Sequence, residues 1–216
     1  MLVNAINGPH MNALSDSLLL DTLQQYLDSN PLPDELWVFA YGSLLWNPEM
    51  SIVETRHGFV DGYERGFNLL STVHRGTPEQ PGLVLSLREG GCCEGVVLKV
   101  NPETKMQDFT NLWRREMVTL FYQPRWCEVS TPKGTVRAIT FVADPEHKQF
   151  VDFDCHTVAE MIYRAHGGRG PNIDYFTNTL EHLASLGIKD PLFESVARYL
   201  GKIDAPQPAT ETLNMA

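Results

Sequence analysis

The stretch SIVETRHGFVDGYERGFNLL, residues 51–70, consists of short runs of β-branched and aromatic residues separated by glycines. Residues of these types favour the pleated surface of a β-strand, and glycine within a strand marks a bulge or a bend. The same composition continues through LVLSLREGG (83–91) and CCEGVVLKV (92–100), after a loop at STVHRGTPEQPG (71–82). Most of residues 52–101 is therefore predicted to form strands.

A helix and a short strand are predicted on the N-terminal side of this region. Residues 15–29, SDSLLLDTLQQYLDS, offer a Ser/Asp cap followed by apolar residues at helical spacing. The prolines of NPLPDE (30–35) cannot continue that helix, and LWVFAYG (36–42) is rich in strand-forming residues. We expect the first strand there.

The C-terminal half alternates between helix and strand signals. One helix is predicted at about 105–120, and RWCEVST (125–131) and TVRAITFVA (135–143) flank a PKG turn that is typical of a hairpin. Beyond residue 155 the chain is mainly helical, with a break at GGRGPN (167–172). This order indicates an α+β fold, with a small, curved mixed β-sheet or barrel and flanking helices. We expect a single domain over the whole chain.

The charge of the chain argues against two classes of partner. The formal net charge is −10, which repels phosphate backbones and anionic lipid surfaces, so we expect no nucleic-acid and no membrane partner. No stretch reaches the roughly 18 apolar residues of a membrane span. The first Lys or Arg is Arg56, so the N-terminus lacks the positively charged segment of a secretory signal. A cytoplasmic location is expected.

Neither the cysteines nor the histidines indicate a metal site. The four cysteines lack C-x-x-C spacing, and the seven histidines form no H-x-x-x-H or H-E-x-x-H pair. We interpret the cysteines as buried or unreactive thiols and expect no metal. These cysteines are Cys92, Cys93, Cys127 and Cys155.

One acidic residue lies within an apolar helix face. In MQDFTNLWRREMVTLFY (106–122) the apolar residues recur at helical spacing, and Glu116 occupies a position inside their stripe. Arg114 and Arg115 are predicted to point away from the stripe, toward solvent. The apolar members of the stripe are Phe109, Leu112, Trp113, Met117 and Leu120.

Two interpretations of Glu116 follow from this position. A carboxylate on an apolar face costs several kcal/mol unless it is paired, hydrogen-bonded or neutralised. One interpretation is a structural ion pair with Arg75, Arg88 or another arginine. The other is a general base whose pKa is raised by burial. The pattern by itself does not decide between them.

The turn after the first strand is a second candidate site. In FAYGSLLWNPE (39–49), Gly42 and Ser43 lack bulk, so a ligand can approach the backbone closely and meet its N–H donors. Ser43 is interpreted as a turn residue rather than a nucleophile, because its neighbours do not form G-x-S-x-G. GGRGPN (167–172) matches a phosphate loop only weakly. With no activated nucleophile in the protein, the pattern favours a substrate that carries its own nucleophile and electrophile.

Three motifs in a fixed order resemble one known family. FAYGSLLWNP (39–48), HRGTPEQPG (74–82) and RREMV (114–118) are similar to those of the ChaC-type, glutathione-specific γ-glutamylcyclotransferases. The likeness extends over most of residues 36–190 and leaves out the N-terminal helix and the tail after about residue 200. It implies cleavage of γ-glutamyl peptides, chiefly reduced glutathione, to 5-oxoproline and Cys-Gly, with no metal or organic cofactor.

The resemblance also implies roles for individual residues. Glu116 corresponds to the catalytic base of the family, and the turn at residues 41–45 corresponds to the part that binds the γ-glutamyl group. In the implied mechanism the substrate α-amine attacks its own γ-carbonyl, and Glu116 takes up the ammonium proton and returns one to the departing nitrogen. The expected substrate-binding residues are Tyr41, Gly42, Ser43, Leu44, Leu45, Arg75 and Tyr122.

Three alternatives remain open at this point. The first is a cyclotransferase for other γ-glutamyl amines or amino acids, and the second is a non-catalytic small-molecule binding protein on the same fold. The third is a hydrolase that uses Ser43, which a serine-reactive phosphonate would label covalently. The sequence predicts no oligomeric state.

Overall fold

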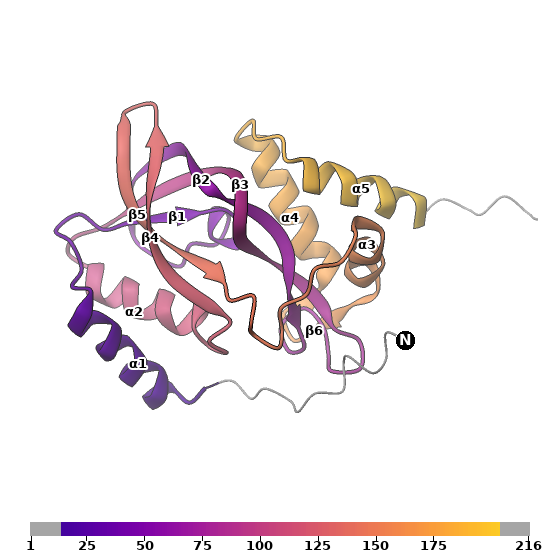
Figure 1. The fold of residues 1–216 in the computed structure, drawn as a ribbon, viewed down its shortest axis with the longest axis horizontal. Helices are drawn as coiled ribbons and strands as arrows, with labels where there is room; N and C mark the ends of the chain where they lie inside the picture. Colours follow the sequence, from indigo (N-terminus) through magenta and orange to yellow (C-terminus); the bar gives the residue numbers. More distant parts are fainter. Residues whose placement is uncertain (1–13, 204–216) are drawn as a thin grey trace, which may run out of the picture.

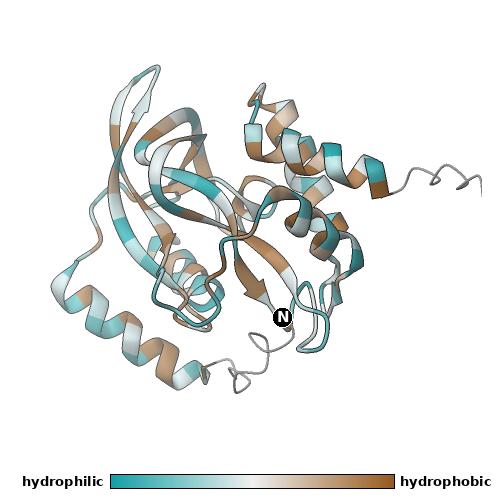
Figure 2. Ribbon diagram, turned by 45° about the vertical axis from the view of Figure 1, so that its right-hand side comes forward, coloured by the Kyte–Doolittle hydropathy of each residue, from teal (hydrophilic) through white to brown (hydrophobic). Residues whose placement is uncertain are grey.

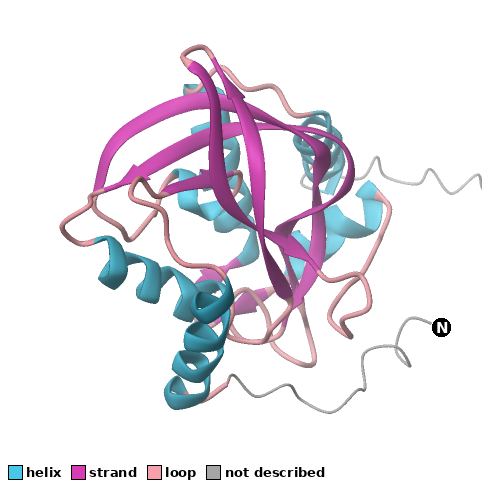
Figure 3. Cartoon of the chain, turned by 60° about the vertical axis from the view of Figure 1, so that its left-hand side comes forward, coloured by secondary structure: helices cyan, strands magenta, loops and turns pink. Residues whose placement is uncertain are grey.

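The computed structural model describes residues 14–203, and their centre is a closed five-stranded β-barrel (Figures 1 and 3). The strand order is β1-β3-β2-β4-β5, and β5 closes the ring by parallel pairing with β1 and β3. The expected α+β fold on a small curved barrel is confirmed. The strands are β1 (Trp37–Ala40), β2 (Ile52–Ser71), β3 (Gly82–Val100), β4 (Tyr122–Thr131) and β5 (Gly134–Ala143).

The two longest strands, β2 and β3, pair in antiparallel orientation and bend as they do so. Their register shifts between Ile52 and Glu54, between Asp61 and Tyr63, and again between Gly66 and Leu69. Such irregularities place an extra residue in one strand and increase its local bend and twist. The glycine-marked breaks in the sequence are therefore bends inside one continuous strand.

Helices cover the barrel from two sides. α1 and α2 lie side by side on one side, and α3, α4 and α5 lie on the other (Figure 1). The predicted N-terminal helix is confirmed, and the Ser15 hydroxyl caps it by accepting a hydrogen bond from the Leu18 N–H at 3.3 Å. The helices are α1 (Asp16–Ser29), α2 (Lys105–Glu116), α3 (Cys155–Arg164), α4 (Asn172–Ser185) and α5 (Pro191–Ile203), with a 3₁₀ turn, η2, at Ser43–Leu45.

The side chains of β1 alternate between two apolar clusters, one on each side of the strand. Successive side chains of a strand point to opposite faces. Hydrophobic and hydrophilic stretches are mixed along the barrel strands (Figure 2). Trp37 and Phe39 belong to the apolar cluster that includes α3, α4 and α5, whereas Val38 and Ala40 belong to the cluster of α1 and α2. All four residues are at most 4% exposed, so β1 is buried between the two layers.

The second helix ends four residues before its predicted end at about residue 120. α2 stops at Glu116, and the Met117 N–H closes its last turn on the Trp113 carbonyl at 2.8 Å. Leu120 has a φ of +56° and is 41% exposed, so it is not part of the apolar stripe. The prediction was wrong here because apolar residues continue at helical spacing after Glu116, whereas residues 117–120 form a turn in which Leu120 has a left-handed backbone.

The break at GGRGPN is a small hairpin. β6 (His166–Gly167) and β7 (Gly170–Pro171) pair in antiparallel orientation and lead into α4. The Asn172 amide, at the start of α4, accepts from the Leu83 N–H at 2.6 Å and donates to the Leu83 carbonyl at 2.9 Å. The hairpin is thereby attached to the beginning of β3.

The four cysteines are free thiols in different surroundings. Cys93 and Cys127 are buried, Cys155 is half-buried and Cys92 is exposed. Burial raises the thiol pKa of Cys93 and of Cys127 to about 12, which keeps both protonated. No helix within residues 14–203 is long and apolar enough to cross a membrane. The expectation about an N-terminal signal concerns residues outside the described part of the chain.

Candidate active site

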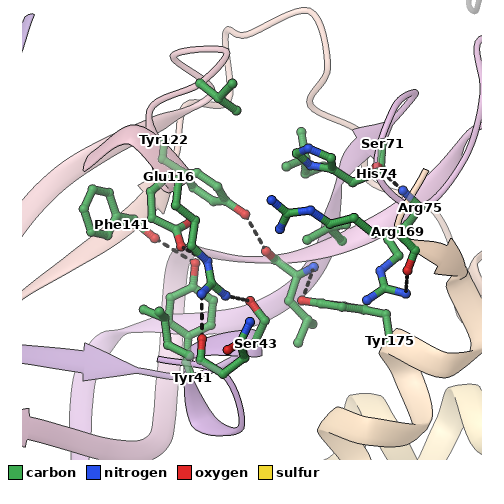
Figure 4. Close-up of a pocket in the computed structure, with 18 of the residues that line it drawn as sticks. Tyr41, Ser43, Ser71, His74, Arg75, Glu116, Tyr122, Phe141, Arg169 and Tyr175 are labelled. Carbon is green, nitrogen blue, oxygen red and sulfur yellow. Dashed lines mark hydrogen bonds and ion pairs between the residues drawn. The ribbon is translucent and has the colours of Figure 1, made fainter. Parts of the chain in front are cut away.

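A cavity of about 210 Å³ opens beside the turn that follows β1 (Figure 4). On one side lie Ser43 and Glu116, together with Arg115, which contacts both of them; we call these three residues the α2 wall. On the other side lie His74 and Arg75, from the loop after β2, and Arg169, from the β6–β7 hairpin; we call these three residues the loop wall. Further lining residues include Tyr41, Gly42, Leu44, Tyr122, Phe141 and Tyr175.

The turn that follows β1 is fixed by hydrogen bonds on two sides. The Tyr41 hydroxyl donates to the Phe141 carbonyl at 2.9 Å, and the Tyr41 carbonyl accepts from Nε of the buried Arg65 at 2.7 Å. A Cβ atom at Gly42 would lie 3.5 Å from the Tyr175 hydroxyl, which is an ordinary contact. The protein itself therefore has room for a methyl group at position 42.

Arg65 connects this turn to the C-terminal helix layer. Its side chain is 2% exposed, and its Nη1 donates to the Asp190 carboxylate at 2.8 Å while its Nη2 donates to the Glu94 carbonyl. The other Asp190 oxygen accepts the Leu192 N–H at 2.9 Å, in the first turn of α5. The position of the Tyr41 carbonyl thus depends on one buried arginine and its aspartate partner.

Glu116 and Arg115 form an ion pair at the end of α2. Arg115 Nε lies 3.2 Å from Glu116 Oε1, and the two side chains are only 12% and 14% exposed. Arg115 also donates to the Ser43 hydroxyl at 2.8 Å and to the Asn47 carbonyl at 2.6 Å. The prediction that Arg115 faces solvent was wrong, because its side chain reaches back to the η2 turn. Glu116 pairs with this neighbour rather than with Arg75 or Arg88.

The carboxyl group of Glu116 has a shifted pKa. Burial raises its pKa above the ordinary value, and the positive charge of Arg115 lowers it by a smaller amount. Burial also raises the hydroxyl pKa of Tyr41 and of Tyr122 well above the usual range, so both remain protonated. The Tyr122 hydroxyl donates to the Leu85 carbonyl at 2.8 Å. Among these three groups, Glu116 is the one with a carboxylate that can accept a proton from a bound ligand.

The loop wall consists of two loops bound to each other through their backbones. The Arg169 N–H donates to the His74 carbonyl at 2.8 Å. Arg75 Nη1 donates in turn to the Arg169 carbonyl at 2.8 Å and to the Pro171 carbonyl at 3.1 Å. The Arg75 guanidinium also lies 5.6 Å from the centre of the Tyr175 ring. Arg75 therefore has a structural function in connecting the two loops.

Glycines allow these loops to approach so closely. A Cβ atom at Gly167 would lie 2.4 Å from the Gly76 nitrogen, and one at Gly76 would lie 2.1 Å from the Gly82 nitrogen. These distances are far shorter than any tolerated contact, and the atoms involved belong to the backbone, which cannot rotate away. Residues with a side chain at these positions would separate the loops that carry His74, Arg75 and Arg169.

Most of the residues that the sequence predicted for the site meet in this cavity. Glu116 lines it together with six of the seven expected substrate-binding residues, whereas Leu45 packs against the two apolar clusters instead. The Ser43 hydroxyl accepts a hydrogen bond from a guanidinium, which cannot take up its proton. The six residues are Tyr41, Gly42, Ser43, Leu44, Arg75 and Tyr122.

Four further cavity or supporting residues were not predicted. Arg115 was assigned to the wrong helix face, and Arg169 lies in the glycine-rich stretch that we interpreted as a weak phosphate loop. The glycines on both sides of Arg169 were the available signal that a backbone passes close to another segment there. Tyr175 and the buried Arg65 had no sequence signal. Tyr175 contacts Leu85, 90 positions away, and Arg65 contacts Tyr41, 24 positions away.

The arrangement is suited to binding a small charged molecule and moving a proton. A buried carboxylate can accept a proton from an ammonium group, and the arginines can bind carboxylates. Within residues 14–203 no group of three His, Cys, Asp or Glu side chains is placed to hold a metal ion. The carboxylate and the arginines of the cavity support acid–base chemistry on a bound substrate.

Solved structures define the class of fold. The crystal structure of a yeast γ-glutamylcyclotransferase specific to glutathione superposes with a TM-score of 0.68 and 20% sequence identity, covering 79% of this chain and all of that chain (100%). At this identity the likeness shows the fold alone. The barrel with its two helical layers is a γ-glutamylcyclotransferase-like fold.

Comparison of sequences shows the family. A family profile described as ChaC-like protein matches residues 36–202. The glutathione-specific γ-glutamylcyclotransferase of Escherichia coli K12 is 38% identical over 197 residues, which are 88% of this chain and 85% of that protein. Gamma-glutamylcyclotransferase 2-3 of Arabidopsis thaliana is 34% identical over 72% of this chain and 83% of its own length. The chain belongs to the ChaC-like family, and the match extends to residue 202, in the last turn of α5 and beyond the expected limit at residue 190.

Proposed function

We propose that the chain is an enzyme that cleaves reduced glutathione to 5-oxoproline and Cys-Gly, as a γ-glutamylcyclotransferase. The observation that carries this proposal is the buried Glu116 carboxylate, which lies beside the Tyr-Gly-Ser turn in a cavity and has a raised pKa. The 38% identity to a relative named as glutathione-specific supports the choice of substrate.

The charge of the cavity suits this substrate. At neutral pH glutathione carries two carboxylates and one ammonium group. The cavity presents three guanidinium groups and one carboxylate, although the chain as a whole has a net charge of −10. Burial and the neighbouring arginines lower the pKa of His74, so its imidazole is mainly neutral at pH 7. The cavity therefore attracts an anionic peptide that also carries one positive charge.

The α-amino acid end of the substrate fits the α2 wall. Its ammonium and carboxylate groups share one carbon atom, so their partners must also be neighbours. Glu116 and Arg115 are such a pair, with opposite charges 3.2 Å apart. In this orientation the ammonium group meets the Glu116 carboxylate, and the α-carboxylate meets the Arg115 guanidinium. The Gly42–Ser43 turn then lies beside the γ-glutamyl chain.

The reaction follows from this placement. Glu116 takes one proton from the α-ammonium group, and the freed nitrogen lone pair attacks the γ-carbonyl carbon of the same molecule. The C–N bond to the cysteinyl nitrogen then breaks as Glu116 returns this proton to that nitrogen. The second proton, which the α-nitrogen loses on becoming the lactam N–H, passes to the same nitrogen, so Cys-Gly leaves with an ammonium group. No water is consumed, and the ring closure yields 5-oxoproline. Because both reacting groups belong to one bound molecule, orientation alone supplies an effective molarity of roughly 10⁵ M or more.

The phenols and the turn supply polar contacts for the bent substrate. Tyr41 and Tyr122 stay protonated, and each donates to a backbone carbonyl, so their oxygen lone pairs remain available as acceptors. The first N–H groups of a helical turn have no acceptor within that turn, which leaves those near Gly42 and Ser43 as donors for the carbonyl oxygen. These assignments are part of the proposal.

Two further statements belong to the same proposal. The cluster that joins the barrel to α3–α5 contains residues from Trp37 to Leu200, which supports a single domain for that part of the chain. Reduced glutathione is the thiol of reducing compartments, which supports a cytoplasmic location and agrees with the free thiols of this chain.

The direct test is the identity of the products. Purified protein is incubated with reduced glutathione, and 5-oxoproline, Cys-Gly and glutamate are quantified by mass spectrometry. Equal amounts of 5-oxoproline and Cys-Gly without free glutamate are expected, and the Glu116→Gln variant serves as the control. Absence of turnover in the wild-type protein would leave the alternative of a non-catalytic binding protein.

A further inference from the structure

One charged group of the cavity has no function in the mechanism above. Of the three guanidinium groups, that of Arg115 is held by Glu116, Ser43 and Asn47, and that of Arg75 by two backbone carbonyls. Within residues 14–203 the Arg169 guanidinium has neither a hydrogen bond nor an ion pair. It is the one cavity guanidinium of this part of the chain for which none of the N–H donors has a protein partner, whereas Arg115 and Arg75 use part of theirs within the protein.

The backbone of Arg169, in contrast, is fixed. Its N–H donates to the His74 carbonyl at 2.8 Å, and its carbonyl accepts from Arg75 Nη1 at the same distance. Figure 4 shows the side chain extending from the β6–β7 hairpin into the cavity, toward Tyr122. Its charge also reaches Glu116, where it lowers the carboxyl pKa. Arg169 thus combines a fixed backbone with an exposed, unpaired guanidinium. This arrangement is suited to binding an anion.

The substrate supplies one anion that the mechanism leaves without a partner. When the α-amino acid end lies on the α2 wall, the other end of the peptide must extend away from that wall. In glutathione this end is the glycine carboxylate of the leaving dipeptide. γ-Glutamyl amines have no carboxylate there. The backbone of Arg169 lies across the cavity from Glu116, the partner of Arg115, so this residue corresponds to the part of the substrate in which these classes differ.

We propose that Arg169 binds the terminal carboxylate of the leaving peptide and sets the preference of this site for γ-glutamyl peptides over γ-glutamyl amines. The inference rests on the proposed function and deepens it. Arg75 has a different part, since its donors hold the backbone of Arg169 in place. His74, largely neutral, contributes no competing charge.

The experiment compares two substrates that differ only at this carboxylate. Reduced glutathione and its C-terminal amide are given to the wild-type protein, to Arg169→Met and to Arg164→Met. Arg164 is a matched control, because it lies at the end of α3, outside the cavity lining, and its side chain is 63% exposed. Since a hydrogen bond between charged groups is at stake, the wild-type protein should prefer glutathione by about 10- to 100-fold in kcat/KM.

In Arg169→Met this preference should disappear. The kcat/KM for glutathione should fall to the level of the amide, mainly through KM, because the contact is remote from the reacting atoms. Arg164→Met should keep the wild-type ratio. Arg169→Lys, which retains a charge at the position, should keep part of the preference, and it provides a second variant should the methionine disturb folding.

Two results would overturn the inference while the proposed function stands. One is a wild-type protein that turns over glutathione and its amide equally well. The other is an Arg169→Met variant that keeps the wild-type ratio. A wild-type protein that produces 5-oxoproline from neither substrate would instead refute the proposed function, and this inference with it.

Discussion

The two walls of the cavity are built by different means. In the α2 wall the side chains themselves are buried and joined, as the Arg115–Glu116 pair with its contact to Ser43 shows. In the loop wall the backbones are joined, and the Arg169 side chain is left exposed. Buried, paired groups hold a fixed pKa and geometry, which proton transfer requires. An exposed side chain on a fixed backbone can admit and release a product.

The largest expected effect concerns Arg65, which supports the turn between the walls. Arg65→Met removes a guanidinium that is 2% exposed and leaves Asp190 and the Tyr41 carbonyl without their donor. Breaking a buried ion pair by removing one partner costs about 3–5 kcal/mol. Chemical denaturation should show a loss of this size in the free energy of unfolding.

A surface arginine provides the control for that measurement. Arg114 pairs with Asp16 at 2.5 Å, and the side chains are 35% and 63% exposed. Because solvent screens such a pair, Arg114→Met should change the unfolding free energy little. Equal destabilisation by the two substitutions would show that the buried pair does not support the turn.

The second effect is on chemistry in the α2 wall. Glu116→Gln keeps the shape of the side chain but cannot accept a proton, so kcat should fall by about 100-fold or more while the protein remains folded. Steady-state kinetics with glutathione and circular dichroism measure the two quantities. Near-normal turnover in a folded variant would remove Glu116 from its assignment as the base.

The pH dependence of kcat in an Arg115 variant tests whether Arg115 tunes the pKa of Glu116 or has only a structural role. A base works only when deprotonated, so the rate falls as the pH drops through the pKa of Glu116. Burial raises this pKa and Arg115 lowers it, so Arg115→Met should raise it further. The acid limb of the kcat profile should therefore move to higher pH, with a lower plateau because the α-carboxylate loses its partner. An acid limb that stays in place would contradict the coupling.

The smallest effect is expected at Ser43. Ser43→Ala removes one acceptor of Arg115, which keeps its contacts to Asn47 and Glu116. The loss in kcat/KM should be about two- to tenfold, the size of a single hydrogen bond in a site with remaining contacts. Inactivity of a folded Ser43→Ala protein, together with an acyl adduct on the wild-type serine, would instead support the hydrolase alternative.

The two walls also differ in how far the sequence could predict them. Glu116 was identifiable because a carboxylate interrupts an apolar stripe, and the Tyr-Gly-Ser turn because small residues follow a strand. Arg115 was misplaced because its side chain reaches back to Ser43 and Asn47, a contact between distant segments that no periodicity marks. Of the loop wall only Arg75 was expected, and His74 and Arg169 were missed. The form of this wall depends on close approaches of Gly76 and Gly167 between distant segments.

The fold was easier to predict from the sequence than the site was, for a related reason. Strand composition and the PKG turn are local signals, and the hairpin of β4 and β5 follows from them. The register shifts that bend β2 and β3 into a barrel depend on partners in the other strand. Sequence patterns therefore predicted which elements form and how the chain alternates between them, but not how the barrel closes around the cavity.

The central claim is that the substrate's own amine is the nucleophile, and N-acetyl glutathione tests it most directly. Acetylation removes the basic lone pair of the α-nitrogen and leaves the γ-glutamyl bond, the thiol and the terminal carboxylate unchanged. The wild-type protein should convert glutathione to 5-oxoproline and Cys-Gly and should leave the acetylated peptide intact under the same conditions. Steady release of Cys-Gly from N-acetyl glutathione, or free glutamate as the first product from glutathione, would contradict the account.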